Sequence, residues 1–233
     1  MEVEATFDGV HVRTSERKDL PKETDRVNID LNLRLSKEYT SGDSGRWRDG
    51  LALWSPNHPQ LYDLKIRLYN ANGKLTDEVQ TTTGMRSLNW TTGDSVFRLN
   101  DKPLFQALCL DQGYWPETFM TPPSSTSLKV DIEMAKRMGL NGCRKHQKVE
   151  DPLFLYWADR LGYLVWGEMA NAYSFSDEYI DRFNGEWNEA VKRDINHPCV
   201  VTWTPVNESW AYTDLKGSVE QRNHIRALYY LTK

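Results

Sequence analysis

The second half of the chain alternates between apolar strand segments and amphipathic helical segments, and this limits the possible folds most. The strand segments read LFQALCL (from Leu104), NGCRKH, YLVWGEMA and CVVTWTPV. Each precedes a helical pattern: SLKVDIEMAKRMG, DPLFLYWADRLG, FNGEWNEAVKRDINHP and VEQRNHIRALYYLTK. This order predicts a parallel sheet, either doubly wound or closed into a barrel, with the first strand buried on both faces. No glycine-rich phosphate loop follows a strand, which argues against nucleotide binding.

The first hundred residues have the alternation typical of half-buried antiparallel strands. VNIDLNLRL (residues 27–35) and YDLKIRLY (residues 62–69) place apolar residues at every second position. Asn72-Gly73 predicts a tight hairpin turn, and VFRLNDKPL predicts a second hairpin with Asn100-Asp101 near its tip. Together these segments predict a small β-sandwich.

Composition excludes several classes of protein. The 233 residues carry 29 basic and 33 acidic side chains, a net charge of −4, so we expect neither nucleic acid nor an anionic membrane as partner. No stretch approaches the length of a membrane-spanning helix. The three cysteines lie in apolar stretches without a CxxC motif, which predicts buried reduced thiols, and no metal site or cofactor is expected.

Polar residues follow each of the four predicted strands. Strand ends of a parallel β/α fold meet at one crevice, where active sites lie in barrels and open sheets alike. We therefore expect six residues to surround one site: Asp111, Arg144, His146, Glu168, Asn207 and Glu208.

The residue types indicate carboxylate chemistry on a sugar. A glutamate in a cleft lined by Trp166, Trp203 and Trp210 would lose hydration, which favours its protonated form and a general-acid role for Glu208. Arg144 would orient a second carboxylate. The nine tryptophans are explained either by core packing or by stacking on sugar rings.

These motifs resemble glycoside hydrolase family 2, which includes β-galactosidases, β-glucuronidases and β-mannosidases. The resemblance runs from about Leu51 to Trp210 through LWSPNHPQLYDLKIRL, GMRSL, LNDKPLFQALCLDQGYW, GLNGCRKHQKVEDPLFLYWADRLGYLVWGEMA and HPCVVTWTPVNESW. It implies an α/β protein with an all-β N-terminal part. Residues 1–103 would form an immunoglobulin-like β-sandwich, and residues 104–233 the first four βα units of a (β/α)8 TIM barrel.

The resemblance also implies roles for individual residues. The Asn-Glu pair after the fourth barrel strand carries the family's acid/base, which falls on Glu208, with Asn207 contacting the sugar near its 2-hydroxyl group. The family arginine after the second strand falls on Arg144. Glu168 matches a carboxylate found after the third strand and is expected to support the site.

Two residues fit the family less well. Relatives often have Arg-x-Ser-His-Tyr-Pro after the second strand, but this chain has RKHQKV, so His146 is one position early. Asp111 is expected at the site from its position alone. The predicted substrate-binding residues are therefore Asn207, Arg144, His146, Glu168, Asp111 and Trp203.

The family cleaves terminal β-linked sugars with retention, using a nucleophilic glutamate after the seventh strand. The chain ends at Lys233, after the fourth helix, so the nucleophile is expected outside it and the chain alone is expected to be inactive. The missing barrel half or a second copy would cover the open sheet edge. Two alternatives remain: an inverting pair of Glu208 with Glu168 or Asp111, and a non-catalytic carbohydrate-binding or interaction fragment.

Overall fold

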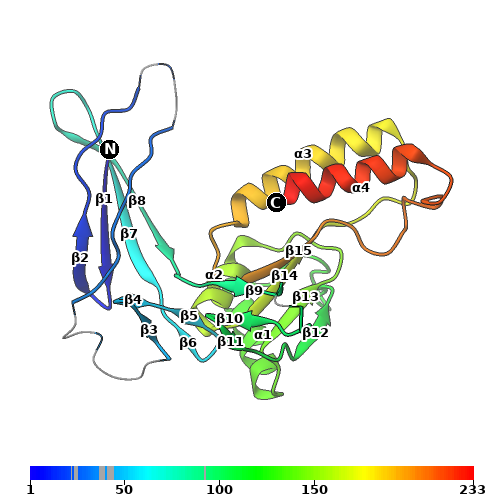
Figure 1. Cartoon of the computed structure of the whole chain (residues 1–233), viewed down its shortest axis with the longest axis horizontal. Helices are drawn as coiled ribbons and strands as arrows, with labels where there is room; N and C mark the ends of the chain where they lie inside the picture. The colour runs from blue at the N-terminus through cyan, green and yellow to red at the C-terminus, as the bar shows by residue number, and fades with distance from the viewer. Residues whose placement is uncertain (22, 24–25, 37–39, 41–44, 92) are drawn as a thin grey trace. The chain divides into compact units, whose positions relative to one another are not determined.

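The computed structural model describes residues 1–21, 23, 26–36, 40, 45–91 and 93–233 (Figure 1). The chain forms two compact units. The first comprises residues 1–87 with 99–101, and the second comprises residues 88–98 with 102–233. Between residues 87 and 102 the chain crosses from the first unit to the second, back to the first and again to the second. The predicted boundary after residue 103 lies just beyond the last of these crossings.

An antiparallel sheet of four strands forms the frame of the first unit. Its order is β2 (Val10–Thr14), β1 (Glu2–Phe7), β7 (Tyr62–Tyr69) and β8 (Leu75–Thr83). The β7–β8 hairpin is the one predicted from Asn72-Gly73, and its Gly73 has a φ of 77°. The β1–β2 hairpin was missed, although its turn at Asp8-Gly9 is a common hairpin signal.

The segment of residues 27–35 does not form the predicted strand, because it joins no β ladder. Its burial nevertheless alternates as expected, with every second residue partly covered. Leu33 and Leu35 pack against the buried core of Phe7, Ala52 and Tyr62. The alternation therefore predicted the buried face correctly and the backbone pairing wrongly.

Short hairpins complete the all-β part of the chain. β3 (Trp47–Arg48) pairs with β4 (Leu51–Ala52), and β5 (Trp54–Ser55) with β6 (His58–Pro59). A three-stranded sheet has the order β11 (Lys102–Pro103), β10 (Arg98–Leu99) and β9 (Leu88–Asn89). The β10–β11 turn at Asn100-Asp101 is the predicted second hairpin, and both residues have positive φ. Of the predicted sandwich, one layer is thus a full sheet, and short hairpins and extended chain replace the other.

Four parallel strands and four helices make up most of the second unit. The strands β12 (Leu108–Asp111), β13 (Gly142–Lys145), β14 (Leu164–Glu168) and β15 (Val200–Thr204) lie side by side in chain order. The helices α1 (Ser125–Arg137), α2 (Pro152–Leu161), α3 (Asp177–Asp194) and α4 (Val219–Thr232) alternate with them (Figure 1). The predicted strand–helix order and parallel direction are confirmed. None of the described helices is long and apolar enough to cross a membrane.

Two element ends differ from the sequence expectation. β12 begins at Leu108 rather than Leu104 and is an edge strand, so the expected burial of its two faces is wrong: Leu110 is 58% exposed. Helix α3 begins at Asp177, before the predicted Phe183, because the Ser176 side chain accepts a hydrogen bond from the Tyr179 amide and caps it there.

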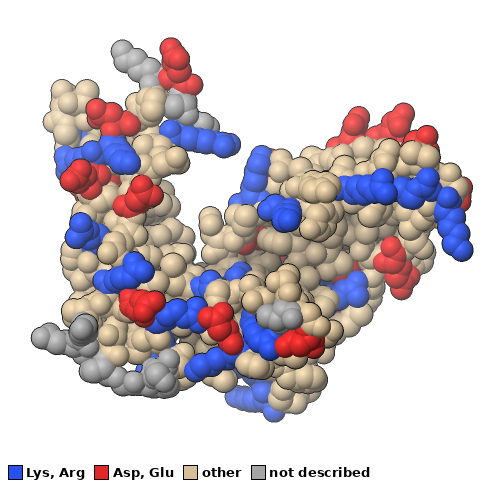
Figure 2. Space-filling model, viewed as in Figure 1, with Lys and Arg blue, Asp and Glu red and all other residues tan. Residues whose placement is uncertain are grey.

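Helix caps and aromatic packing position the helices. Asp151 caps α2, Pro152 occupies its first turn, and Gly162 ends it in the left-handed conformation, all as predicted. Helices α3 and α4 enclose a core of Trp187, Tyr212, Phe183 and their neighbours. Acidic and basic side chains are interspersed on the face of the molecule drawn in Figure 2.

The buried hydroxyl of Tyr62 provides a test of the first unit. It accepts a hydrogen bond from the Ala52 amide at 2.7 Å. We expect Tyr62→Phe to lower the free energy of unfolding by about 1–3 kcal/mol, because the buried amide loses its acceptor. Urea unfolding measures the loss. Tyr156→Phe, at an exposed position on α2, is the control, and equal stability of both variants would contradict the assigned hydrogen bond.

Candidate active site

Arg144 connects three strand ends of the parallel sheet. Its Nε donates to Glu168 Oε2 at 2.7 Å, and its Nη2 donates to Asn207 Oδ1 at 2.5 Å. The other carboxylate oxygen of Glu168 accepts from the Gln147 backbone amide at 2.9 Å. Glu168 and Asn207 are buried, at 1% and 4% exposure. We call these four residues the Arg144 cluster, and it joins three of the predicted site residues.

The hydrogen bonds within the cluster determine which polar atoms of its members remain available to a ligand. Both oxygens of Glu168 accept hydrogen bonds, so this carboxylate holds Arg144 and the chain after β13 in place. Asn207 accepts through Oδ1, which leaves its Nδ2 group as the donor for a ligand. Asn171 Nδ2 approaches the Asn207 carbonyl at 3.5 Å, and Tyr179 on α3 holds Asn171 through a hydrogen bond of 2.8 Å.

Gln147, a member of the cluster, and Glu208, the residue after Asn207, have a backbone conformation that residues other than glycine rarely adopt. Gln147 has a φ of 55° and Glu208 a φ of 52°. Such left-handed conformations cost energy in residues other than glycine, and they gather at functional sites where the surroundings enforce them. Here the Arg144 cluster holds the residue on one side of Glu208, so the strain coincides with the predicted catalytic position.

Of the three tryptophans predicted to line a cleft around Glu208, Trp203 does not lie there. Trp203 packs edge-on against Trp187 of α3 at a centroid distance of 5.6 Å, because strand alternation turns it to the helix side of the sheet. The Trp166 indole donates to Gln106 at 2.8 Å. Glu208 itself is exposed, so the expected desolvation of its carboxyl group is not found.

Asp111 belongs to a second polar group, on the opposite face of the sheet from Arg144. Its Oδ2 contacts Lys145 Nζ at 2.6 Å, and Lys145 also contacts Glu150 at 2.6 Å. Lys148 pairs with Glu150 at 2.9 Å and completes this Lys145 cluster. Asp111 is paired in register with Lys145, so alternation directs its side chain away from the Arg144 cluster. The prediction that it lines the same site is corrected.

Burial and charge oppose each other in the Lys145 cluster. Burial by itself would lower the pKa of Lys145, but attraction to Asp111 and Glu150 raises it overall. Burial would likewise raise the pKa of Glu150, but Lys145 outweighs it and lowers that pKa. Both residues are therefore held in their charged forms, which braces the start of α2 against the end of β13.

His146 lies at the end of β13, next to the β12 edge. Its Nδ1 is 3.0 Å from Gln112 Nε2. This hydrogen bond joins the ends of β12 and β13, whereas the Arg144 cluster joins β13, β14 and the chain after β15. A sugar-binding role for His146 stays a prediction, and Gln112 is the partner that the sequence reasoning had not assigned to it.

A third group lies at the opposite end of β15. Side-chain atoms of Asp159, His197 and Cys199 that could bind a metal ion lie within 4.8 Å of one another. The hydrogen bonds inside the group account for this proximity: Asp159 contacts His197 Nδ1 at 2.6 Å and accepts from the Cys199 amide at 3.0 Å. All three cysteines are reduced thiols, as predicted; Cys143 and Cys199 are buried, whereas Cys109 is only partly buried.

Comparison with known proteins finds glycosidases among the relatives of this chain. The model of the family "Glycosyl hydrolases family 2" matches residues 6–86. A β-galactosidase of Thermoanaerobacter pseudethanolicus is 30% identical over 165 residues, which are 69% of this chain and 22% of the relative. A putative β-glucuronidase of Formosa agariphila is 28% identical over 170 residues, 67% of this chain and 16% of the relative. The chain belongs to glycosyl hydrolase family 2.

Solved structures extend the likeness to the whole of this family 2 chain. A Parabacteroides merdae β-glucuronidase matches with a TM-score of 0.78 at 18% identity, over 99% of this chain and 28% of that one. A Ruminococcus gnavus β-glucuronidase, solved with D-glucuronic acid, matches with a TM-score of 0.76 at 20% identity, over 99% and 35%. At these identities the likeness shows the fold. The chain spans less than a quarter of the length of the two sequence relatives named above.

Removing the central cation should test the Lys145 cluster. Lys145→Met keeps the contact with the Phe154 ring but leaves Asp111 and Glu150 without their shared buried partner. We expect the free energy of unfolding to fall by about 3–5 kcal/mol. Lys129→Met, at a half-exposed ion pair on α1, is the control and should change stability by less than about 1 kcal/mol. Equal losses in denaturant unfolding would contradict the cluster.

The same cluster predicts an acid-sensitive contribution to stability. The pKa of Glu150 is lower in the folded chain than its ordinary value of 4.5, so its contribution is complete above about pH 4.5. It is lost as pH falls through the lower folded value. Melting temperatures between pH 7 and pH 3 should therefore decline less steeply in Glu150→Gln than in the wild type. Parallel declines would show that Glu150 does not contribute.

Proposed function

We propose that this chain carries the acid/base half of the active site of a retaining exo-β-glycosidase, with Glu208 as general acid and base. The observation that carries the proposal is the fixed geometry around Asn207. Arg144 fixes the Asn207 amide, Glu168 fixes Arg144, and Glu208 follows at once in a strained conformation. Catalysis requires such fixed geometry, because the general acid must be held next to the glycosidic bond that it protonates.

The parallel sheet supports a barrel origin for this site. Its four strands, each followed by a helix, correspond to half of a (β/α)8 barrel, and the Arg144 cluster lies at the C-terminal strand ends where barrel enzymes act. We infer that residues 104–233 are the first four βα units of such a barrel. Further barrel strands or a second copy would then cover the open edges of β12 and β15.

The contacts of the other two candidate carboxylates argue against an inverting pair. Glu168 uses both oxygens within the Arg144 cluster, and Asp111 is held by Lys145 on the other face of the sheet. Neither is free to activate water opposite Glu208. The nucleophile, about 5 Å from the acid/base in a retaining enzyme, would then come from polypeptide outside these 233 residues.

The proposed reaction uses Glu208 twice. The protonated carboxyl group of Glu208 gives its proton to the glycosidic oxygen while the nucleophile attacks the anomeric carbon and the leaving group departs. The Glu208 carboxylate then takes a proton from water as that water displaces the enzyme nucleophile. Asn207 Nδ2 donates to a sugar hydroxyl group. Its orientation by Arg144 keeps this donor in place through both steps.

The names of the relatives suggest the substrate class. They are β-glucuronidases and β-galactosidases, so we propose a terminal β-linked hexose or uronic acid as the sugar that is released. The alternative of a non-catalytic carbohydrate-binding fragment is favoured by one observation, the exposure of Glu208. Under that alternative the chain would bind such sugars in any context and never cleave them.

A single substitution tests the proposed role of Glu208. In a protein that carries these residues within a complete barrel, Glu208→Gln should lower kcat on alkyl β-glycosides by about 10²–10⁴-fold, because it removes the proton donor. Steady-state kinetics with a panel of β-glycosides measures this loss. Glu189→Gln, exposed on α3, is the control and should leave kcat unchanged.

The 233-residue chain alone should bind without turnover or not bind. Sustained hydrolysis by the isolated chain, lost in Glu208→Gln, would show that both carboxylates lie within it and would overturn the proposed location of the nucleophile. Full activity of Glu208→Gln in the complete protein would overturn the proposed acid/base itself. Sugar binding by a complete protein that cleaves no glycoside would favour the non-catalytic alternative.

A further inference from the structure

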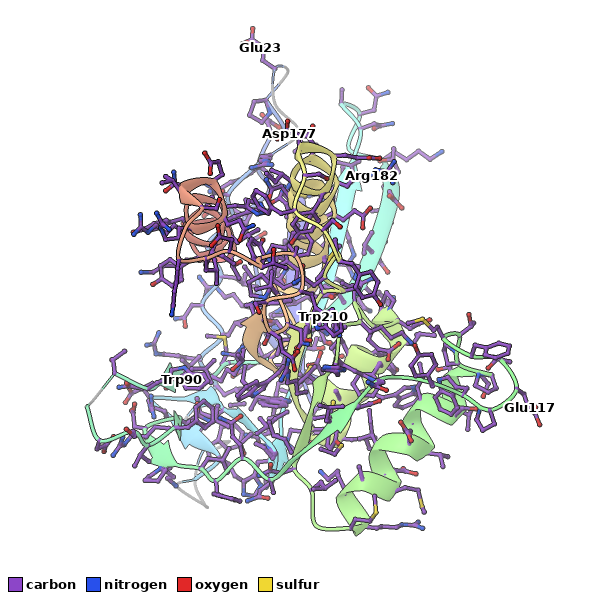
Figure 3. The ribbon with its side chains drawn as sticks, turned by 90° about the vertical axis from the view of Figure 1, so that its right-hand side faces the viewer. Glu23, Trp90, Glu117, Asp177, Arg182 and Trp210 are labelled. Atoms are coloured by element: carbon purple, nitrogen blue, oxygen red, sulfur yellow. The ribbon has the colours of Figure 1, made fainter. Side chains whose placement is uncertain are left out.

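Two large aromatic side chains are exposed on the loops that follow β14 and β15. Tyr173, on the β14–α3 loop, is 80% exposed, and Trp210, on the β15–α4 loop, is 45% exposed. Their rings meet edge to face, with centroids 5.3 Å apart and an interplanar angle of 81°. Neither belongs to the core enclosed by α3 and α4. Figure 3 labels Trp210.

The backbone on both sides of Trp210 is anchored, and the Trp210 ring contacts the Tyr173 ring. Asn207 is buried before it, and Ala211 and Tyr212 are buried directly after it. The Tyr212 hydroxyl contacts the Tyr179 hydroxyl at 3.1 Å and His224 Nδ1 at 2.8 Å. Between these anchors only the short turn with Glu208 and Trp210 faces solvent.

The Tyr173 loop is fastened to the same turn. Asn171, two residues before Tyr173, reaches the Asn207 carbonyl, and Tyr179 holds Asn171. Tyr173 also lines an open cleft of about 560 Å³ formed by its own loop and the first turns of α3. That volume lies in the range of sites for small ligands. The exposed pair is therefore prearranged, and Tyr173 has open space beside it.

The position of the pair relative to Glu208 determines which part of a substrate it can meet. Trp210 follows Glu208 by two residues, so their Cα atoms are separated by at most about 7 Å. A general acid contacts the glycosidic oxygen, which joins the released sugar to the leaving group. Asn207, the buried residue before Glu208, has its side-chain donor available for the released sugar. The exposed rings lie on the other side of Glu208 in the chain, and they are therefore positioned for the leaving group.

We propose that Tyr173 and Trp210 form the binding platform for the leaving group, and that they select glycosides in which this group is a second sugar ring or an aromatic ring. Indole and phenol faces stack on the apolar face of a pyranose and on aromatic rings. The inference rests on the proposed function, because it takes Glu208 as the acid/base. It goes further by assigning the second half of the substrate to these two residues.

Two substrates with the same released sugar test the platform in a complete enzyme. One is a β-disaccharide, and the other is the β-glycosyl fluoride, whose leaving group is too small to touch either ring. We expect Trp210→Ala and Tyr173→Ala each to lower kcat/KM for the disaccharide about five- to tenfold, chiefly through KM. The value for the fluoride should stay within about twofold. Trp210→Phe should retain most of the activity on the disaccharide.

Trp90 provides a matched control because it is 44% exposed and belongs to β9–β10 rather than to the turn after β15. Trp90→Ala should leave both substrates unaffected. Equal losses on disaccharide and fluoride in Trp210→Ala would mean that the rings only support the position of Glu208, and this would overturn the platform. Unchanged kinetics on both substrates in Trp210→Ala and Tyr173→Ala would overturn it as well.

The same measurements separate failure of this inference from failure of the proposed function. A wild-type enzyme that cleaves both substrates, with disaccharide cleavage lost in Glu208→Gln, upholds the acid/base whatever the aromatic variants do. Full disaccharide activity in Glu208→Gln would remove the acid/base and the platform together.

Discussion

The guanidinium group of Arg144 is the contact on which the candidate site depends. Glu168 is buried with a charge that needs partners, and Arg144 supplies one while the Gln147 amide supplies another. The same guanidinium group fixes the Asn207 side chain at the end of the next strand. One planar cation thus sets the spacing of β13, β14 and the chain after β15, and Glu208 takes its position from that chain.

Strand alternation divides the polar residues of the sheet into two clusters, one at the candidate site and one that stabilises the fold. The Arg144 cluster lies on one face, where the Asn207 side chain keeps its Nδ2 donor available and Glu208 follows in a strained backbone conformation. The Lys145 cluster lies on the helix side, where buried charges satisfy one another. Because Arg144 and Lys145 are adjacent in sequence, the pleat of one strand places the candidate ligand site and a structural ion cluster back to back.

Much of this arrangement was predictable from local patterns. The strand–helix order, the caps of α2 and two hairpin turns depend on residues close in sequence, and all are found where expected. Strand pairing and the contacts of individual side chains were harder to predict. Residues 27–35 alternate in burial without joining a ladder, β12 is an exposed edge, and Trp203 faces α3. Each outcome depends on neighbours that are distant in the chain.

The sequence by itself determined the succession of elements, the family and the residues that gather at strand ends, because periodicity, turn residues and motif order are local properties. Only the tertiary structure decided which of those residues share a site. It joined Arg144 to Glu168 and Asn207, sent Asp111 to the other face, and brought Tyr173 against Trp210. The physical reason is that register and the direction of a side chain from a strand are set by pairing across the sheet and by packing against helices.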